Sequence, residues 1–134
     1  MIEYLLPGDS VHGEDGSVLT FQKDGNLVLY SIVENEKRAV WCSDNYNSQK
    51  TYKRGGDKVV FGPNGKLVMY KNEDILWQSH SSEDMFHGNL VCITNDSIQI
   101  LKASPGDLLS IKDTRIADEK RMLLENNSEI YRIK

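Results

Sequence analysis

Two stretches of the chain repeat the same pattern of apolar and polar residues, and a third stretch repeats it more weakly. Residues 21–30 read FQKDGNLVLY, residues 61–70 read FGPNGKLVMY, and the weaker copy lies at residues 91–101. An apolar segment with a tryptophan follows each of the first two copies, with Trp41 in the first and Trp77 in the second. Repetition of this kind indicates a fold that is assembled from equivalent units. The chain is therefore expected to form three similar units around one core.

Each copy has the pattern of a β-hairpin. The Lys-Asp-Gly sequence at residues 23–25 and the Pro-Asn-Gly sequence at residues 63–65 fit three-residue loops that end in a glycine with positive φ. The third copy is shorter and predicts a two-residue turn at residues 95–96. These loops fix which side chains face each other, and side chains alternate across a strand, so each hairpin gains one apolar face. The predicted apolar pairs are Phe21 with Leu27, Leu19 with Leu29, Ile93 with Ile98, and Val91 with Ile100.

A hairpin with one apolar face needs a second layer to cover that face. Three equivalent sheets whose apolar faces meet at an axis satisfy this requirement, with Trp41, Trp77 and Leu109 at the centre. The predicted fold is therefore all-β, a triangular prism of three antiparallel sheets in a pseudo-threefold arrangement. A barrel or a sandwich also fits the pattern. The first unit is longer before its tryptophan, which predicts a loop insertion around residues 33–37.

The three hairpin units lie near residues 18–41, 58–77 and 90–111, and together they predict one domain at residues 1–112. Residues 113–134 are expected to form a short C-terminal extension past the prism. The pattern of this extension is compatible with a short helix followed by a strand.

The outer face of the first hairpin carries a set of side chains that suits a sugar. Gln22, Asp24, Asn26, Val28 and Tyr30 supply two amides, a carboxylate, a small apolar surface and a phenol. Neighbouring hydroxyl groups both donate and accept hydrogen bonds, so they pair well with carboxylates and amides. A hydrogen bond to a charged carboxylate contributes about 1.5–3 kcal/mol, against about 1 kcal/mol for a neutral pair. The alternative is a purely structural hairpin, because Asp-Gly turns between alternating strands also occur without any ligand.

Residues 22–30 resemble the signature of the bulb-type (monocot) mannose-binding lectins, Gln-x-Asp-x-Asn-x-Val-x-Tyr, at every fixed position. The Leu-Pro-Gly-Asp sequence at residues 6–9, the three hairpins and the tryptophans are also similar, so the resemblance covers roughly residues 2–112. It implies a β-prism of the second type (β-prism II) and mannose as the ligand. The contacts that it implies are Asp24 and Asn26 with the axial 2-hydroxyl, Gln22 with the 3-hydroxyl, Tyr30 with the 4-hydroxyl, and Val28 with the ring carbons.

The second and third copies depart from this signature. The second copy keeps Val68 and Tyr70 but has Asn64 and Lys66 in place of the acid and the amide. Loss of the carboxylate and gain of a cation predict weak or absent mannose binding at this degenerate second site, with an acidic sugar as the alternative ligand. The third copy keeps Asp96 on a shorter turn, which displaces the carboxylate, so no sugar site is expected there.

Charge and motif content argue against several functions. The formal net charge of −4 is unfavourable for binding nucleic acid or anionic membranes, because both are bound through basic patches. No apolar run is long enough to span a membrane. The histidines His12, His80 and His87 lack metal-ligand spacing, and no nucleophile or phosphate-binding motif occurs. The chain is therefore not expected to be an enzyme, and it is not expected to need a metal or another cofactor.

The two cysteines and the C-terminal segment bear on location and assembly. Cys42 and Cys92 are too few for a disulfide scaffold and are expected to be reduced and mostly buried. The first residues lack the features of a signal peptide, so the cytoplasm is the default location, with secretion by another route as the alternative. In the resembled family a disulfide often joins the first turn to the second unit, but this chain has Gly25 in that turn. C-terminal strands of the family often exchange between subunits. The loss of that disulfide fits a reducing compartment, and the resemblance suggests a homodimer through residues 113–134.

The sequence thus favours a non-catalytic lectin for mannose-containing glycans with one intact site on the first hairpin. A protein-interaction module on the same scaffold is the second hypothesis, and an antimicrobial or toxin-like lectin is the third.

Overall fold

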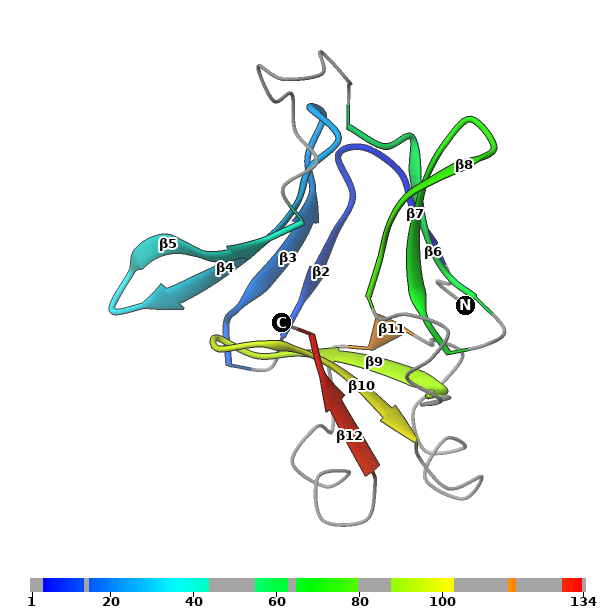
Figure 1. Ribbon diagram of the computed structural model, residues 1–134. Helices are drawn as coiled ribbons and strands as arrows, with labels where there is room; N and C mark the ends of the chain where they lie inside the picture. Colours follow the sequence, from blue (N-terminus) through cyan, green and yellow to red (C-terminus); the bar gives the residue numbers. More distant parts are fainter. Residues whose placement is uncertain are drawn as a thin grey trace.

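The strands form three four-stranded sheets (Figure 1). The computed structural model describes residues 4–13, 15–43, 55–62, 65–79, 88–102, 116–117 and 129–133. No helix occurs within these ranges. The three sheets lie like the sides of a triangle in Figure 1. The predicted all-β prism is therefore confirmed.

Each sheet has one of the three repeat hairpins at its centre. The first sheet has the order β2 (Ser10–His12), β3 (Val18–Phe21), β4 (Leu27–Val33) and β5 (Glu36–Cys42). The second has the order β1 (Tyr4–Leu5), β6 (Lys58–Phe61), β7 (Leu67–Lys71) and β8 (Asp74–Gln78). The third has the order β11 (Ile116–Ala117), β9 (Leu90–Ile93), β10 (Ile98–Lys102) and β12 (Glu129–Arg132). The edge strand β1 thus precedes the first hairpin in the chain but pairs in the second sheet.

One apolar core lies between the three sheets. Every sheet contributes to a single cluster side chains that are at most 2% exposed. Examples are Leu19 and Leu29 from the first sheet, Val59 and Met69 from the second, and Ile93 and Ile100 from the third. Full burial of a side chain of this size contributes about 1.5–3 kcal/mol. Each sheet therefore depends on the other two for much of its stability.

The predicted hairpin registers are confirmed in the first and third units. The observed pairs are Phe21 with Leu27, Leu19 with Leu29, Ile93 with Ile98, and Val91 with Ile100. The third hairpin also has the short turn that was expected at residues 95–96. There, the backbone N–H of Thr94 donates to the carbonyl oxygen of Ser97 at 3.0 Å.

The first two turns close in the same way at their described residues, as the Asp-Gly and Asn-Gly sequences predict. Gly25 and Gly65 have φ values of 85° and 78°, a region that favours glycine. The N–H of Gly25 donates to the carbonyl oxygen of Gln22 at 2.8 Å, and that of Gly65 donates to Gly62 at 3.1 Å. The two hairpins can therefore be compared position by position.

The C-terminal segment differs from the expectation. Residues 113–134 were placed past the prism, but β11 and β12 from this segment pair within the third sheet. Tyr131 lies opposite Ile100, and this pairing satisfies backbone groups that an uncovered edge of β10 would leave without partners. β11 runs parallel to β9, so the third sheet is not purely antiparallel. The helix considered for this segment falls largely outside the described residues.

The centre of the prism only partly matches the prediction. Trp41 and Trp77 meet edge to face, with ring centroids 5.6 Å apart and an interplanar angle of 61°. Both pack against the core, but both stay partly exposed. Leu109, the expected third member, lies outside the described residues.

The predicted insertion around residues 33–37 lengthens a hairpin. β4 and β5 continue past the prism and project from it (Figure 1). They join through Glu34 and Asn35, whose φ values of 53° and 65° are those of a tight two-residue hairpin turn. The first unit therefore has a longer β-ribbon than the second.

Candidate functional site

Contacts between side chains join three of the five predicted site residues on the first hairpin. The side-chain carbonyl of Gln22 accepts a hydrogen bond from the hydroxyl of Tyr30. The amide nitrogen of Gln22 lies 3.3 Å from both carboxylate oxygens of Asp24. This is the orientation of the amide that satisfies both neighbours. Gln22 therefore bridges the carboxylate in the turn and the phenol on β4.

Asp24 also stabilises its own turn. One of its carboxylate oxygens, Oδ1, accepts a hydrogen bond from the backbone N–H of Asn26 at 2.9 Å. The residue is exposed, and a carboxylate offers about four lone-pair sites. The contacts with Gln22 and Asn26 therefore leave acceptor capacity on Asp24 for a ligand.

Asn26 and Val28 are less accessible than the alternation of the strand predicts. They are 5% and 4% exposed. The side-chain oxygen of Asn26 accepts a hydrogen bond from the Ser43 hydroxyl at 2.9 Å, and that hydroxyl accepts from the backbone N–H of Leu27 at 3.1 Å. Asn26 thus ties the turn to the residue that follows β5, which is a structural role that the sequence did not reveal.

Lys37 lies next to the far end of the site. Its ammonium nitrogen is 4.3 Å from the centre of the Tyr30 ring, within the range of a cation–π interaction. Lys37 stands opposite Ile32 in the long β4–β5 ribbon, so the insertion delivers this cation. The contact helps to hold the Tyr30 ring in place, and no local sequence pattern indicates it.

The turn itself packs against another part of the backbone. A Cβ atom added to Gly25 would lie 2.3 Å from the Cα atom of Gly55. The N–H of Gly56 donates to the carbonyl oxygen of Gly25 at 3.1 Å. The segment before β6 therefore fixes the position of the turn that carries Asp24.

The second hairpin reproduces the turn but not the polar network. Lys66 stands where the first hairpin has Asn26, and its ammonium donates to the Gln78 carbonyl oxygen at 3.3 Å. Lys66 is only 8% exposed. Gly62 replaces Gln22 and has no side chain to reach Tyr70, while Val68 is buried as Val28 is. Asn64 lies outside the described residues.

The third hairpin uses its polar groups within the turn. The hydroxyl of Thr94 accepts hydrogen bonds from the backbone N–H groups of Asp96 and Ser97, both at 3.0 Å. Gln99 is buried, and its side-chain oxygen has no hydrogen-bond partner among the described residues. Asp96 is exposed, and its carboxylate makes no contact with a described amide or phenol of the kind that Asp24 makes with Gln22.

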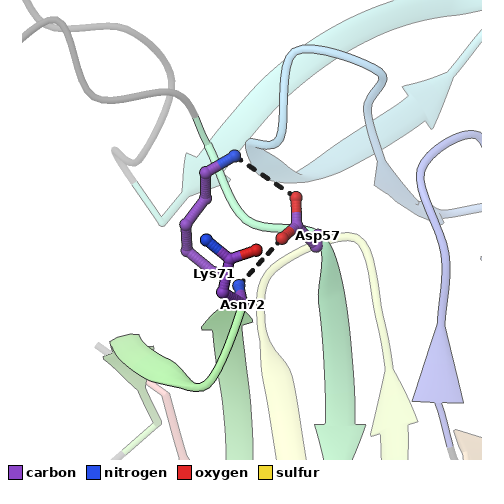
Figure 2. A network of polar contacts seen from close by, with 3 residues as sticks. All are labelled: Asp57, Lys71 and Asn72. Atoms are coloured by element: carbon purple, nitrogen blue, oxygen red, sulfur yellow. Dashed lines mark hydrogen bonds and ion pairs between the residues drawn. The ribbon is translucent and has the colours of Figure 1, made fainter.

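A separate polar network stabilises the second sheet (Figure 2). One carboxylate oxygen of Asp57 accepts from the backbone N–H of Asn72 at 2.9 Å, and the other lies 3.4 Å from the Lys71 ammonium. The hydrogen bond from Asn72, followed by the interaction with Lys71, holds the pKa of Asp57 below its usual value, although partial desolvation opposes the shift. Asn72 has a φ of 57°, so this network secures a strained turn between β7 and β8.

Cys42 and Cys92 do not form a disulfide with each other. Cys92 is buried, as expected, but Cys42 on β5 is exposed, which contradicts the expectation of two mostly buried thiols. Within the described ranges, no group of three or more His, Cys, Asp or Glu side chains could hold a metal ion. In the same ranges, no helix is long and apolar enough to cross a membrane.

No protein-family model matches the chain, and no curated protein matches it. Two solved structures of lectins are similar to it. A monomeric monocot mannose-binding lectin from Gastrodia elata shares 23% sequence identity over 75% of this chain and 77% of that chain, with a TM-score of 0.36. A lectin from Allium sativum shares 20% identity over 97% of this chain and 93% of that chain, with a TM-score of 0.40.

Proposed function

We propose that this protein is a carbohydrate-binding lectin that holds a mannose-type sugar on the outer face of its first hairpin. The bridge that Gln22 makes between Asp24 and Tyr30 carries the proposal. It keeps a carboxylate, an amide and a phenol together before any ligand arrives. Groups that are already ordered lose little conformational entropy on binding, which favours recognition of a small polar ligand.

The chemistry of these groups matches neighbouring hydroxyls on a sugar ring. Asp24 accepts hydrogen bonds from hydroxyls, and the Gln22 amide and the Tyr30 phenol both donate and accept. Val28 and Asn26 lie deeper, so they contact the ligand only at its inner edge. The resemblance of residues 22–30 to the lectin signature favours mannose among the hexoses.

A single site of this kind binds weakly. A few hydrogen bonds on an open face replace hydrogen bonds to water, and the net gain per bond is only about 1 kcal/mol. Useful affinity would come from several linked sites on one target. A homodimer through residues 113–134, as the sequence suggests, would supply two linked first-hairpin sites.

Titration of the isotope-labelled protein with methyl α-mannoside tests the proposal. The amide signals of residues 22–30 are expected to shift. The Asp24→Asn variant keeps the shape of the side chain but removes its charge, so its affinity should fall about tenfold. Asp96→Asn makes the same change on the third hairpin and should bind as the wild type does. Unchanged binding by Asp24→Asn would contradict the assignment.

A protein-interaction role is the second candidate, and one observation favours it. Three large aliphatic side chains on strands of two sheets are exposed, namely Val33 on β4 (57%), Val40 on β5 (44%) and Ile75 on β8 (56%). Exposed apolar side chains are typical of surfaces that contact other proteins, provided that they form a continuous patch. In a pull-down, a protein partner that binds this protein even in excess mannose would support this role over sugar binding. The same partner should not bind the Val33→Ser variant.

A further inference from the structure

The outer face of the second hairpin carries two cations. Lys58 lies directly opposite Tyr70, and Lys66 lies on the same face because side chains alternate along β7. The described residues that share this face include no Asp or Glu. Since the whole chain has a formal net charge of −4, this face differs in sign from the molecule as a whole.

Lys66 is an unusual residue because it is buried without a counter-charge. It is 8% exposed, and its ammonium has three N–H donors. The hydrogen bond to Gln78 is with a neutral amide, and no described carboxylate lies within ion-pair distance of Lys66. Burial of a charge without an opposite charge is unfavourable, so an anion beside Lys66 would be stabilising. Gln78 is exposed, so the ammonium lies beside a surface residue, as is common for the end of a lysine side chain.

The other groups on this face suit a sugar that carries such an anion. Tyr70 is half-buried, and Gly62 leaves its hydroxyl without the glutamine contact that Tyr30 has in the first hairpin. The ammonium of Lys58 is 5.8 Å from the centre of the Tyr4 ring and makes no ion pair with the described residues. Lys66, Lys58 and Tyr70 therefore offer two cations and a phenol along one strand pair.

We propose that the second hairpin is a binding site for an acidic sugar, separate from the first hairpin. Lys66 pairs with the carboxylate or sulfate of the sugar through charge-assisted hydrogen bonds. Tyr70 and Gln78 hydrogen-bond to its hydroxyls, and Lys58 attracts the anion at longer range. This site does not depend on mannose binding at the first hairpin.

The test compares methyl β-glucuronide with methyl β-glucoside, which lacks only the carboxylate. The labelled full-length protein is titrated with each, and the amides of residues 65–70 are followed. Glucuronide should shift these amides, and glucoside should not. Lys66→Met should weaken glucuronide binding about tenfold or more. Lys102→Met removes the same charge from an exposed position on β10 and should have no effect.

Further outcomes separate this site from its alternatives. Tyr70→Phe keeps the packing and should weaken binding less than Lys66→Met does. The Asp24→Asn variant should bind glucuronide normally, so failure at the first hairpin is distinguishable from failure here. Equal responses to glucuronide and glucoside, or normal binding by Lys66→Met, would overturn the proposal. Inorganic phosphate that gives the same shifts at the same concentration would overturn the assignment to a sugar.

Discussion

Gly25 meets two separate constraints at once. Its φ of 85° lies in the left-handed region, and its Cα faces Gly55 so closely that a Cβ would lie 2.3 Å from the Gly55 Cα. The Asp-Gly sequence predicts the first constraint, because a hairpin loop of this length needs such a residue. The second constraint depends on Gly55, which lies far along the chain, and no local sequence pattern predicts it.

Replacement of Gly25 by alanine should therefore destabilise the protein more than the same change at Gly16. Gly16 also has positive φ, at 93°, but its added Cβ would meet only the Ile32 carbonyl oxygen at 3.8 Å. Gly16→Ala should lower the free energy of unfolding by about 1 kcal/mol. Gly25→Ala adds a backbone clash, so a loss of about 2–4 kcal/mol is expected. Urea titration of both variants measures the difference, and equal losses would contradict the close approach.

The individual site residues were predictable to different degrees. The grouping of Gln22 with Tyr30 follows from the hairpin register, because both lie on one face near the same turn. The burial of Asn26 does not follow, since it depends on Ser43 from the far end of the next strand. The position of Lys37 over Tyr30 depends on how the long ribbon twists, which the residue pattern does not specify.

The turn between β7 and β8 is held by Asp57, the residue directly before β6 (Figure 2). The pKa of Asp57 is lowered from 3.8, mainly by the hydrogen bond from the Asn72 N–H. A group with a depressed pKa in the folded state stabilises the fold above its unfolded pKa, and this contribution disappears as the pH falls through the folded value. The network therefore contributes at neutral pH and is lost in acid.

The variant Asp57→Asn should be less stable than the wild type at neutral pH. The gap between the two should shrink as the pH falls below about 3.8, where Asp57 begins to protonate in the unfolded chain. Midpoints of urea unfolding across a pH series measure this gap. Lys71→Met should keep most of the pH dependence, because Asn72 is the larger cause of the shift. A gap that stays constant down to pH 2 would show that the carboxylate charge is not involved.

β12 is the strand that the sequence indicates at the C-terminal end of the chain, but the residue pattern did not show that it completes the third sheet. The hairpins were predictable because their turns and alternation are local, whereas β12 pairs with β10 across a long connection. Ile133, just after β12, is 7% exposed and belongs to the core cluster. Its N–H also donates to the carbonyl oxygen of Ile98 at 2.9 Å. The edge strand is thus anchored by both packing and hydrogen bonding.

Ile133→Ala should lower the free energy of unfolding by about 2–4 kcal/mol, as expected when a buried aliphatic side chain is truncated. Val33→Ala makes a comparable change on the exposed end of β4 and should stay within about 0.5 kcal/mol of the wild type. Chemical denaturation of both variants provides the measurement. A small effect of Ile133→Ala would indicate that β12 contributes little to the fold.

At the scale of the whole molecule, the repeat pattern predicted the prism because three equivalent apolar faces can cover one another. It did not predict how the edges are completed. The parallel pair of β9 and β11, and the pairing of β1 with the second sheet, join segments that have no repeat counterpart. Those contacts depend on which backbone edges remain open once the hairpins have packed.

The way the edge strands complete the sheets has an evolutionary and engineering consequence. The second sheet takes β1 from ahead of the first hairpin, and the third sheet takes β11 and β12 from beyond the last one. The second repeat therefore cannot be excised with its full complement of strands as one continuous segment, and a duplicated copy would find no vacant side of the triangle to occupy. A tandem array can gain or lose whole repeats, whereas this prism holds three sheets and has no place for a fourth.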